Sequence, residues 1–400
     1  MQILFIHKIT KNSDTKVLDA INDLLLMFNH NVVLISYKDI KTVNFNLYSL
    51  VLIYNHPLSK KAIDFIEKAS IPKILILEES KIVYTFISNS TRYNKIIFLK
   101  DNDIKVTNYF PISLIENLSY PFCAKKERIQ NEKNERINAL VVLKSHYANE
   151  LIIKITPVLN YFWDIDFKIV SNINNFPEIF NKNTTIVGCE NLDEIIGKSD
   201  FIIGNSSYVL QAILADKPVI VVGDNGYGGL ITPLTISNQY HSLFVGRIGG
   251  EIREHIPVKL LIDDIITINK MNEKEKQHLI EQNILFLNEQ QTKLSIALNN
   301  IITNTVSSYS EIKNNLLNLQ LKITNDFNIT FLDKESFVIT RKSTNFSHSI
   351  IDKDCFEIIR QFKEGNDVLT VMNQTNNGAN KEGFKRFVID LINENILEIK

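Results

Sequence analysis

Gly204-Asn205-Ser206-Ser207 and Gly223-Asp224-Asn225-Gly226-Tyr227-Gly228-Gly229 are the two stretches of sequence that decide the fold. All thirteen glycines of the 400 residues lie after residue 187, and ten of them fall between Gly188 and Gly250. Glycine is enriched where a backbone turns sharply or must lie close to a ligand. We therefore expect the small-molecule chemistry of the protein to lie in the middle of the chain.

Apolar runs typical of buried parallel strands precede both stretches: Phe201–Ile203 leads into the first, and Pro218–Val222 leads into the second. Upstream, the sequence predicts strands at 139–143, 167–170 and 185–187, and helices at 149–161 and 191–198, with a further helix at 208–215. Both stretches thus follow the carboxyl ends of neighbouring strands, where open α/β sheets bind ligands.

A first α/β domain is predicted over residues 1–125. Its short apolar runs predict strands at 3–6, 31–36, 50–54, 73–77 and 96–99, with amphipathic helices at 14–28 and 60–69. The charged segment 124–136 reads as a connector. The second α/β domain then covers 137–265, so the fold class is α/β with two Rossmann-like domains.

The last third of the chain differs in kind. Residues 252–325 are mostly helical by pattern, and 266–325 are expected to form a helical connector. A hairpin at 329–331 and 336–340, helices at 352–362, 367–373 and 383–395, and a strand at 397–399 predict a small winged-helix-like domain over 327–400.

Composition excludes several classes of protein. The net charge is −1, and residues 326–400 hold ten Lys or Arg against twelve Asp or Glu, so no nucleic-acid binding is expected. No apolar run reaches the length of a membrane span. The chain starts on a strand-like run without a cationic leader, and its three cysteines are far apart. These features predict a cytoplasmic protein without a metal cluster.

The first glycine-rich stretch suits a phosphate, because a strand runs directly into a helix there. Backbone amides and the positive end of the helix dipole then point at one spot. Ser206 or Ser207 can cap that helix. Turn chemistry is the alternative interpretation of Asp224 and Asn225. Trp163, with Tyr161 and Phe162, is interpreted as core.

The segment from Gly204 through Gln211-Ala212 and Lys217-Pro218-Val219 to Gly223 resembles the donor-binding half of GT-B glycosyltransferases. Residues 227–233 and 244–247 are similar to a Gly-Gly-x-Val-Thr-Pro…Phe-x-Gly-Arg pattern in some bacterial members. The resemblance is close over about fifty residues and loose over 1–265. It implies a nucleotide-sugar donor of UDP or GDP type, no metal and no tightly bound cofactor.

The resemblance also implies roles for individual residues. The diphosphate would lie near Gly204, Asn205, Ser206 and Ser207, and the donor sugar or phosphate near Asn225, Gly226, Tyr227, Gly228 and Gly229. Arg247 and Lys144 would neutralise the leaving diphosphate, and Glu190 would lie in a loop facing the base. A surface salt bridge is the alternative for Arg247.

One position departs from the family pattern, since the Glu that usually holds the ribose hydroxyls is Gln211 here. Gln can bind a hydroxyl without charge, which puts donor affinity in question. His7 and His56 follow the first and third strands and are the candidate catalytic bases. The alternative for each is a surface or loop-capping histidine.

The C-terminal segment resembles the peptide chaperones that serve as recognition elements for ribosomally made, modified peptides. The resemblance implies that a precursor peptide binds as an added strand at the hairpin 329–340. A structural or dimerising appendage is the alternative, and a homodimer would follow from it. DNA binding is disfavoured by the acidic balance.

These observations together predict a glycosyltransferase that modifies a side chain of a captured precursor peptide. A non-catalytic GT-B-like scaffold in peptide maturation is the alternative. A nucleotide-sugar epimerase would need several clustered acid and base groups, which the sequence does not offer.

Overall fold

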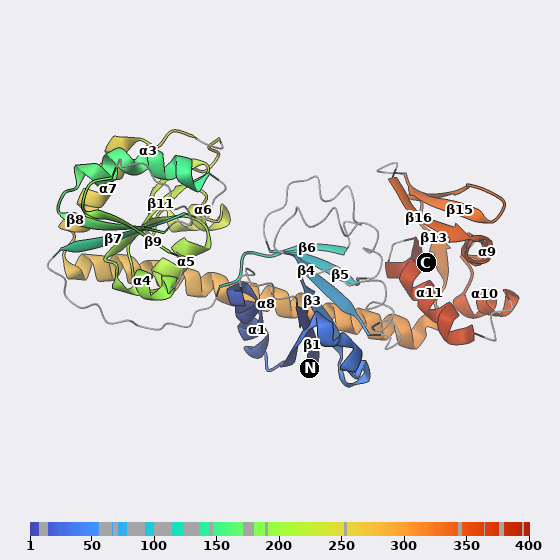
Figure 1. Ribbon diagram of the computed structural model, residues 1–400. Coiled ribbons are helices and arrows are strands. Elements are labelled where there is room, and N and C mark those ends of the chain that lie inside the picture. The colour runs from blue at the N-terminus through green and yellow to red at the C-terminus, as the bar shows by residue number, and fades with distance from the viewer. Residues whose placement is uncertain are drawn as a thin grey trace. The chain divides into compact units, whose positions relative to one another are not determined.

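The computed structural model describes residues 1–7, 15–55, 66, 71–77, 93–99, 114–122, 136–143, 147–170, 180–188, 191–251, 254–342, 346–363, 365–375, 380–393 and 396–400. Its contacts divide the chain into two compact units. The first unit comprises Met1–Pro121 and Leu294–Lys400, and the second comprises Phe122–Lys293. Figure 1 labels the helices and strands of both.

The first unit contains a six-stranded parallel sheet with the order β2-β1-β3-β4-β5-β6. Most of its strands are buried apolar runs, as expected for strands covered on both faces. Each fully buried Ile, Leu or Phe contributes about 1.5–3 kcal/mol. The strands are β1 Gln2–His7, β2 Asn31–Ser36, β3 Leu50–Tyr54, β4 Lys73–Leu77, β5 Lys95–Phe98 and β6 Ile115–Asn117.

Helix α1 (Thr15–Leu26) connects β1 to β2 and buries an apolar stripe. Asn29 follows it with φ of +55°, a conformation that glycine usually adopts after a helix. Two short 3₁₀ helices, η1 (Tyr37–Thr42) and η2 (Phe45–Leu47), lie between β2 and β3.

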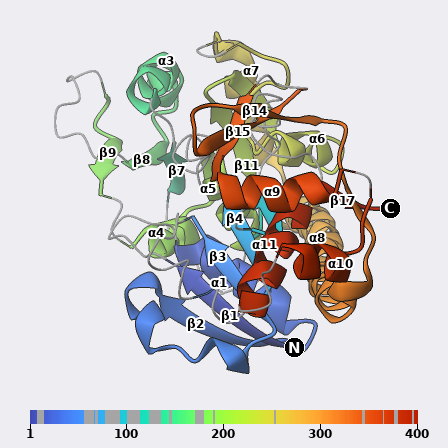
Figure 2. The same cartoon turned by 90° about the vertical axis from the view of Figure 1, so that its right-hand side faces the viewer.

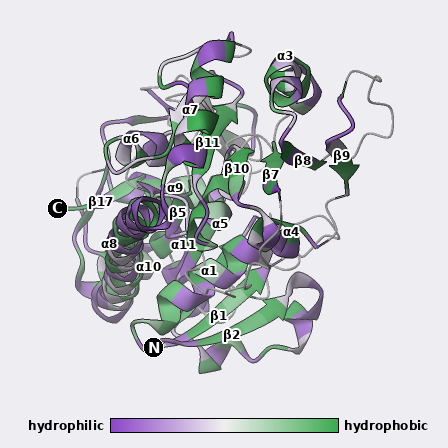
Figure 3. Ribbon diagram, turned by 90° about the vertical axis from the view of Figure 1, so that its left-hand side faces the viewer, coloured by the Kyte–Doolittle hydropathy of each residue, from purple (hydrophilic) through white to green (hydrophobic). Residues whose placement is uncertain are grey.

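The second unit contains a mixed six-stranded sheet with the order β12-β11-β10-β7-β8-β9. Read from β9, this is the 3-2-1-4-5-6 order of a Rossmann fold, with an antiparallel last strand. Figure 3 shows how hydrophobic its central strands are. The strands are β7 Ile137–Val142, β8 Ile165–Val170, β9 Thr184–Val187, β10 Phe201–Gly204, β11 Val219–Gly223 and β12 Gly226–Leu230.

Helices cover both faces of the second sheet (Figure 1). Helices α3 (Ala148–Tyr161) and α7 (Val258–Lys270) pack together and share one apolar core with the sheet. Helices α4 (Leu192–Lys198) and α5 (Ser207–Leu214) pack together in their turn. Helix α6 (Ile236–His241) follows β12.

A single helix, α8, runs without a break over Glu273–Asn315, where the sequence pattern suggests separate segments. Its first half belongs to the second unit and its second half to the first. In the second unit, the amide of Asn283 donates to the Ile231 carbonyl at 3.3 Å. In the first unit, His30 Nε2 lies 2.9 Å from Asn299 Oδ1.

The C-terminal part forms a three-stranded antiparallel sheet, a two-stranded sheet and three helices around one core (Figure 2). The three-stranded sheet has the order β14-β15-β16, and β13 pairs with β17. The elements are β13 Leu321–Ile323, β14 Phe327–Phe331, β15 Ser336–Arg341, β16 Phe346–Asp352, α9 Lys353–Gln361, α10 Val368–Gln374, α11 Lys381–Asn393 and β17 Leu397–Ile399.

The α/β fold class with two Rossmann-like sheets is confirmed, as are the predicted hairpin and three helices of the C-terminal part. The core interpretation of Trp163 and Tyr161 is wrong, since they are 79% and 60% exposed. Only Phe162 of that trio is buried. The connector 124–135 and most of the expected helix 60–69 lie outside the described residues, and the four-part domain division stays a prediction.

None of the helices in the described part of the chain is both long enough and apolar enough to cross a membrane.

Candidate functional site

The strand order of the second sheet reverses between β7 and β10. Open α/β sheets bind ligands at such a reversal, beside the carboxyl ends of the strands. Leu143 follows the end of β7. Gly204 ends β10 and is followed by Asn205 and Ser206. The first glycine-rich stretch therefore lies where the topology predicts a ligand.

The turn from β10 into α5 has an unusual backbone. A methyl group at Gly204 would come within 2.8 Å of the Val142 carbonyl oxygen, so glycine lets β10 lie close to β7. Ser206 has φ of +57° and ψ of −141°, which costs a residue other than glycine about 1–3 kcal/mol. Strain of this kind is concentrated at functional sites.

Helix α5 starts directly after this strained residue. The first amides of a helix have no acceptor within it, and the helix dipole favours an anion there. The hydroxyl of Ser206 makes no capping bond, so the predicted side-chain cap at this residue is wrong. Ser207 and Gln211 lie one helical turn apart and are both partly exposed, whereas Asn205 is buried.

The second glycine-rich stretch forms a β-hairpin, and the predicted loop is therefore wrong. Strand β12 returns antiparallel to β11 with Gly226 opposite Gly223. Asp224 and Asn225 form the connecting turn, which confirms their turn chemistry. The hairpin turn stays near the carboxyl ends of the strands, whereas Gly229 lies farther back along β11.

A third segment, residues 244–247, joins the two glycine-rich stretches. The Phe244 carbonyl accepts a hydrogen bond from the Ser206 amide at 3.3 Å. The Val245 carbonyl accepts one from the Asn225 amide at 2.9 Å, and the Asn225 carbonyl accepts one from the Arg247 amide at 3.1 Å. The two stretches therefore contact one shared segment, as a common ligand site requires.

Arg247 lies on this third segment and is exposed. Its guanidinium Nη1 pairs with Glu254 Oε1, and the two side chains are 66% and 25% exposed. The salt-bridge interpretation of Arg247 is confirmed. Its contact with a diphosphate stays a prediction.

Tyr227 packs toward α7 and not toward the hairpin turn. Its hydroxyl donates to Asp264 and lies 3.0 Å from the Leu260 carbonyl. Asp264 Oδ2 also accepts from the Leu230 amide at 2.7 Å. Burial, and then the bond to Asp264, raises the pKa of Tyr227, and burial raises the pKa of Asp264. This network fixes β12 on the helix.

Gly228 is required by packing on the other face of the hairpin. A methyl group there would come within 2.8 Å of the Val221 side chain and 2.9 Å of Gln239 Nε2. Gln239 donates to the Gly228 carbonyl at 3.2 Å, while its buried Oε1 has no hydrogen-bond partner among the described residues. A ligand role for Gly228 stays a prediction.

His7 ends β1, where the order of the first sheet reverses between β1 and β3. The residue is 8% exposed, and burial lowers the pKa of its imidazole. Its Nδ1 has no hydrogen-bond partner in the described part of the chain. The structure thus places a buried imidazole with a lowered pKa at the reversal of the first sheet.

Three predicted site residues, His56, Lys144 and Glu190, lie outside the described residues. Their neighbours in sequence are informative. His56 follows Asn55, which comes directly after β3. Lys144 comes two residues after the end of β7.

Sequence reasoning missed three residues that hold the hairpin: Asp264, Gln239 and Glu254. Asp264 and Gln239 lie on helices, where one polar residue among several gives no signal of a buried partner. Glu254 lies in a loop eight residues after Gly246. Its signal is the glycine at 250, where a methyl group would meet Glu254 Oε2 at 2.4 Å.

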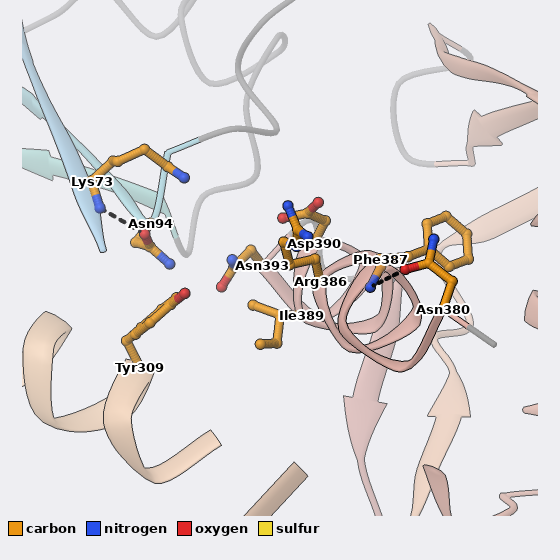
Figure 4. A pocket seen from close by; sticks show the side chains of 10 residues that line it. Lys73, Asn94, Tyr309, Asn380, Arg386, Phe387, Ile389, Asp390 and Asn393 are labelled. Atoms are coloured by element: carbon orange, nitrogen blue, oxygen red, sulfur yellow. Dashed lines mark hydrogen bonds between the residues drawn. The ribbon is translucent and has the colours of Figure 1, made fainter. Parts of the chain in front are cut away.

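A polar pocket of about 370 Å³ lies within the first unit (Figure 4). Its lining includes Lys73 and Asn94 from the first sheet, Tyr309 from α8, and Arg386 and Asp390 from α11. Burial, and then Asp390, raises the pKa of Tyr309 to about 12. The pocket contains none of the site residues predicted from sequence.

Among the described residues, no group of three or more His, Cys, Asp or Glu side chains could hold a metal ion.

No protein-family model matches the chain, and no curated protein matches its sequence. Among solved structures it is similar to a TarM variant from S. aureus in complex with fondaparinux, alpha-GlcNAc-glycerol and UDP. The identity is 13%, the TM-score is 0.45, and the match covers 68% of this chain and 57% of TarM. The chain thus spans little more than half of that protein.

The chain is also similar to the glycosyltransferase SnogD from Streptomyces nogalater, at 11% identity and a TM-score of 0.38, over 76% of this chain and 99% of SnogD. MurG from Acinetobacter baumannii matches at 12% identity and a TM-score of 0.42, over 76% of this chain and all of MurG. The fold assignment rests on the strand order of the two six-stranded sheets.

Proposed function

We propose that the protein is a glycosyltransferase of the GT-B class whose second unit binds a nucleotide-sugar donor of UDP or GDP type. The observation that carries the proposal is the meeting of three segments at the reversal of the second sheet. These are the strained turn before α5, the turn of the hairpin, and residues 244–247.

The donor diphosphate binds at the start of α5 in this proposal. The amides of the first helical turn and the helix dipole supply the positive potential without a metal. The hydroxyl of Ser207 and the amide of Gln211 supply hydrogen bonds from the same face. Arg247 and Lys144 supply charge-assisted contacts as the leaving diphosphate develops negative charge.

His7 is the general base of the proposed reaction, with His56 as the second candidate. Burial lowers the pKa of His7, so its imidazole is neutral at pH 7 and able to accept a proton from an acceptor hydroxyl. The Nδ1 atom, which has no partner among the described residues, keeps hydrogen-bonding capacity for an acceptor group.

The C-terminal part binds the acceptor, a ribosomally made precursor peptide, as an added strand. Strand β15 pairs on both sides, so among the described strands the predicted hairpin keeps one open edge, that of β14. The amide of Leu332 donates to the Ser336 carbonyl at 3.0 Å. Because amide direction alternates along a strand, the amides of Ile329 and Phe331 point away from β15, toward that open edge.

An aromatic ladder lies beside this edge and offers a hydrophobic contact to a bound peptide. Phe331 is 66% exposed and contacts Phe337 edge to face at 5.6 Å. Phe337 stacks on Phe356 of α9 at 3.9 Å. Main-chain bonds from β14 supply affinity, and the exposed ring favours an apolar side chain in the peptide.

A non-catalytic scaffold is the second candidate, and Gln211 favours it. The carboxylate that binds ribose hydroxyls in the resembled family is replaced there by an uncharged amide. Arg247 is also already paired with Glu254. Both features weaken the expected affinity for a donor.

Thermal unfolding and calorimetry with UDP, GDP and the other nucleoside diphosphates separate the two candidates. A donor site stabilises the fold by about 2.7 kcal/mol at a ligand concentration of 100 Kd. Arg247→Ala should lower the affinity for the diphosphate about tenfold or more without unfolding the protein. If no nucleoside diphosphate shifts the unfolding transition, the transferase proposal is wrong and the scaffold remains.

Peptide capture is tested with a fluorescently labelled peptide from any short reading frame that is found beside the gene. Phe331→Pro removes an outward amide, whereas the matched control Phe331→Ala removes only the ring. Proline should abolish binding and alanine should weaken it. Equal binding by the wild type and the proline variant would exclude strand addition at β14.

A further inference from the structure

The ion pair between Arg247 and Glu254 lies against the hairpin turn, in the same cluster as the proposed donor site. A methyl group on Gly226 would come within 3.1 Å of Glu254 Cβ, and one on Gly250 would come within 2.4 Å of Glu254 Oε2 and 2.6 Å of the Asn225 carbonyl oxygen. The Glu254 carboxylate is therefore packed beneath the turn, while the Arg247 side chain extends into solvent.

The two carboxylate oxygens of Glu254 have different surroundings. Oε1 pairs with the guanidinium of Arg247, whereas Oε2 is buried and has no hydrogen-bond partner in the described part of the chain. Without Arg247 the Glu254 carboxylate would lose the partner of Oε1 while Oε2 stays buried, and this desolvation is costly. We therefore expect Arg247 to stay on Glu254 when an anion arrives and to contact the anion with its remaining N–H groups.

The pair has no net charge. Arg247 can therefore donate hydrogen bonds to an anion, but it attracts the anion less strongly than an unpaired guanidinium would. Asp224 and Glu251, the other charged residues between 223 and 251 in sequence, are both acidic, and the ammonium of Lys154 donates to the Glu254 backbone carbonyl at 3.4 Å. The negative charge of Glu254 acts on any anion bound to Arg247 and repels it more strongly as the charge of the anion increases.

We propose that Glu254 sets the charge selectivity of the donor site, so that the site holds a nucleotide sugar in preference to the released nucleoside diphosphate. The inference rests on the proposed function. In the transfer step, the acceptor oxygen bonds to the anomeric carbon and gives its proton to the base. The bond from that carbon to the β-phosphate oxygen breaks, and the electron pair stays on the diphosphate.

The diphosphate thereby gains charge within the site. A terminal phosphate has a second pKa near 6, so the product carries close to one negative charge more than the donor at neutral pH. Repulsion by Glu254 acts on this added charge and favours release of the product. Glu254 contacts the ligand only through Arg247 and its own field, so it is a specificity-determining residue and not a catalytic one.

Calorimetry with UDP and UDP-glucose, and with GDP and GDP-mannose, tests the inference on the full-length protein. Glu254→Gln keeps the shape and the acceptor oxygen but removes the charge. We expect the variant to bind the nucleoside diphosphate about fivefold more tightly relative to the nucleotide sugar than the wild type does, for a charge separation of about 8 Å at an intermediate dielectric.

Glu194→Gln is the matched control, because Glu194 forms an exposed pair with Lys198 on α4 of the same unit. It should leave the ratio of the two affinities unchanged. Arg247→Gln is the second variant, and it should shift the ratio the opposite way, since Glu254 then repels the anion without a compensating cation. This variant decides the question if Glu254→Gln does not fold.

The outcomes separate the two proposals. If the wild type binds none of these nucleotides, both the proposed function and this inference are wrong. If the wild type binds and the ratio is the same in wild type, Glu254→Gln and Arg247→Gln, the donor site stands and the role of Glu254 is refuted.

Discussion

Replacing Gly223 with alanine should detach the third segment of the candidate site from the hairpin. The added methyl group would lie 2.3 Å from the Val245 carbonyl oxygen and 2.5 Å from its carbonyl carbon. The backbone at Val245 must therefore retreat by about 1 Å to reach an ordinary contact. Backbone atoms cannot rotate away as a side chain can, so the whole segment has to move.

The magnitude follows from two contributions. Overpacking in a close-packed region costs about 1–3 kcal/mol. The 2.9 Å bond from the Asn225 amide to the Val245 carbonyl is lost in addition, at about 0.5–1.5 kcal/mol. Docking of residues 244–247 should thus weaken by about 2–4 kcal/mol, which is a factor of about 30–1,000 in the local opening equilibrium.

Native-state hydrogen exchange with peptide-level mass spectrometry measures this opening. The amides of Asn225 and Arg247 should lose protection by that factor, whereas Ile202 in β10 serves as an internal reference because its bond to the Pro218 carbonyl lies at the other end of the strand. Unchanged protection at Asn225 would refute the docking of the third segment on the hairpin.

Three further outcomes are expected. Tyr227→Phe should lower the free energy of unfolding of the second unit, measured in urea, by about 1–2 kcal/mol. The loss should be larger at pH 8 than at pH 5, because the ionised Asp264 loses the hydroxyl donor that lowers its raised pKa. An equal loss at both pH values would contradict the buried pair. Burial lowers the pKa of His7, so the unfolded state binds more protons than the folded state below about pH 6.5. The free energy of unfolding should therefore decrease as the pH is lowered below that value, and His7→Gln should make this decrease smaller. An equal decrease in the variant would exclude a contribution from His7. Burial, and then Asp352, raises the pKa of Cys355 to about 12, so peptide mapping should find slow alkylation of this thiol at pH 8 and faster alkylation in Asp352→Asn; rapid labelling of the folded wild type would refute this.

The strands that sequence analysis predicted well are continuous apolar runs. Residues 50–54 and 219–222 are short, β-branched or leucine-rich, and fully buried, so the pattern and the structure agree. Strand β6 was missed because Ile115-Glu116-Asn117 holds one apolar residue. Strand β16 was missed because its first half, Phe346-Ser347-His348-Ser349, holds one apolar residue.

The glycine-rich hairpin could not be predicted as a strand from its composition. Gly226-Tyr227-Gly228-Gly229 has low strand propensity, although its strand partner β11 is adjacent in sequence. Asp264 and Gln239 hold it from two helices. Such long-range contacts decide the outcome where local preference is weak.

The candidate site was partly visible in the sequence. A strand followed by Gly204-Asn205-Ser206-Ser207 and a helix indicates an anion-binding turn, and the topology puts that turn at the reversal of the sheet. The strained backbone of Ser206 and the charge on Glu254 beneath the hairpin were not visible. Ser206 bonds to Phe244, and Glu254 packs beside Gly226 and Gly250, and no local pattern encodes these contacts.

Asparagine takes the place of glycine in several turns of this chain, with φ of +55° at Asn29, +47° at Asn55 and +59° at Asn191. A glycine-poor chain samples fewer backbone conformations before it folds and so gives up less entropy when it does. The ordering entropy per residue is therefore greatest around Gly223–Gly250. The part of the protein that loses the most conformational entropy on folding is therefore also the part that a bound small molecule would rigidify most.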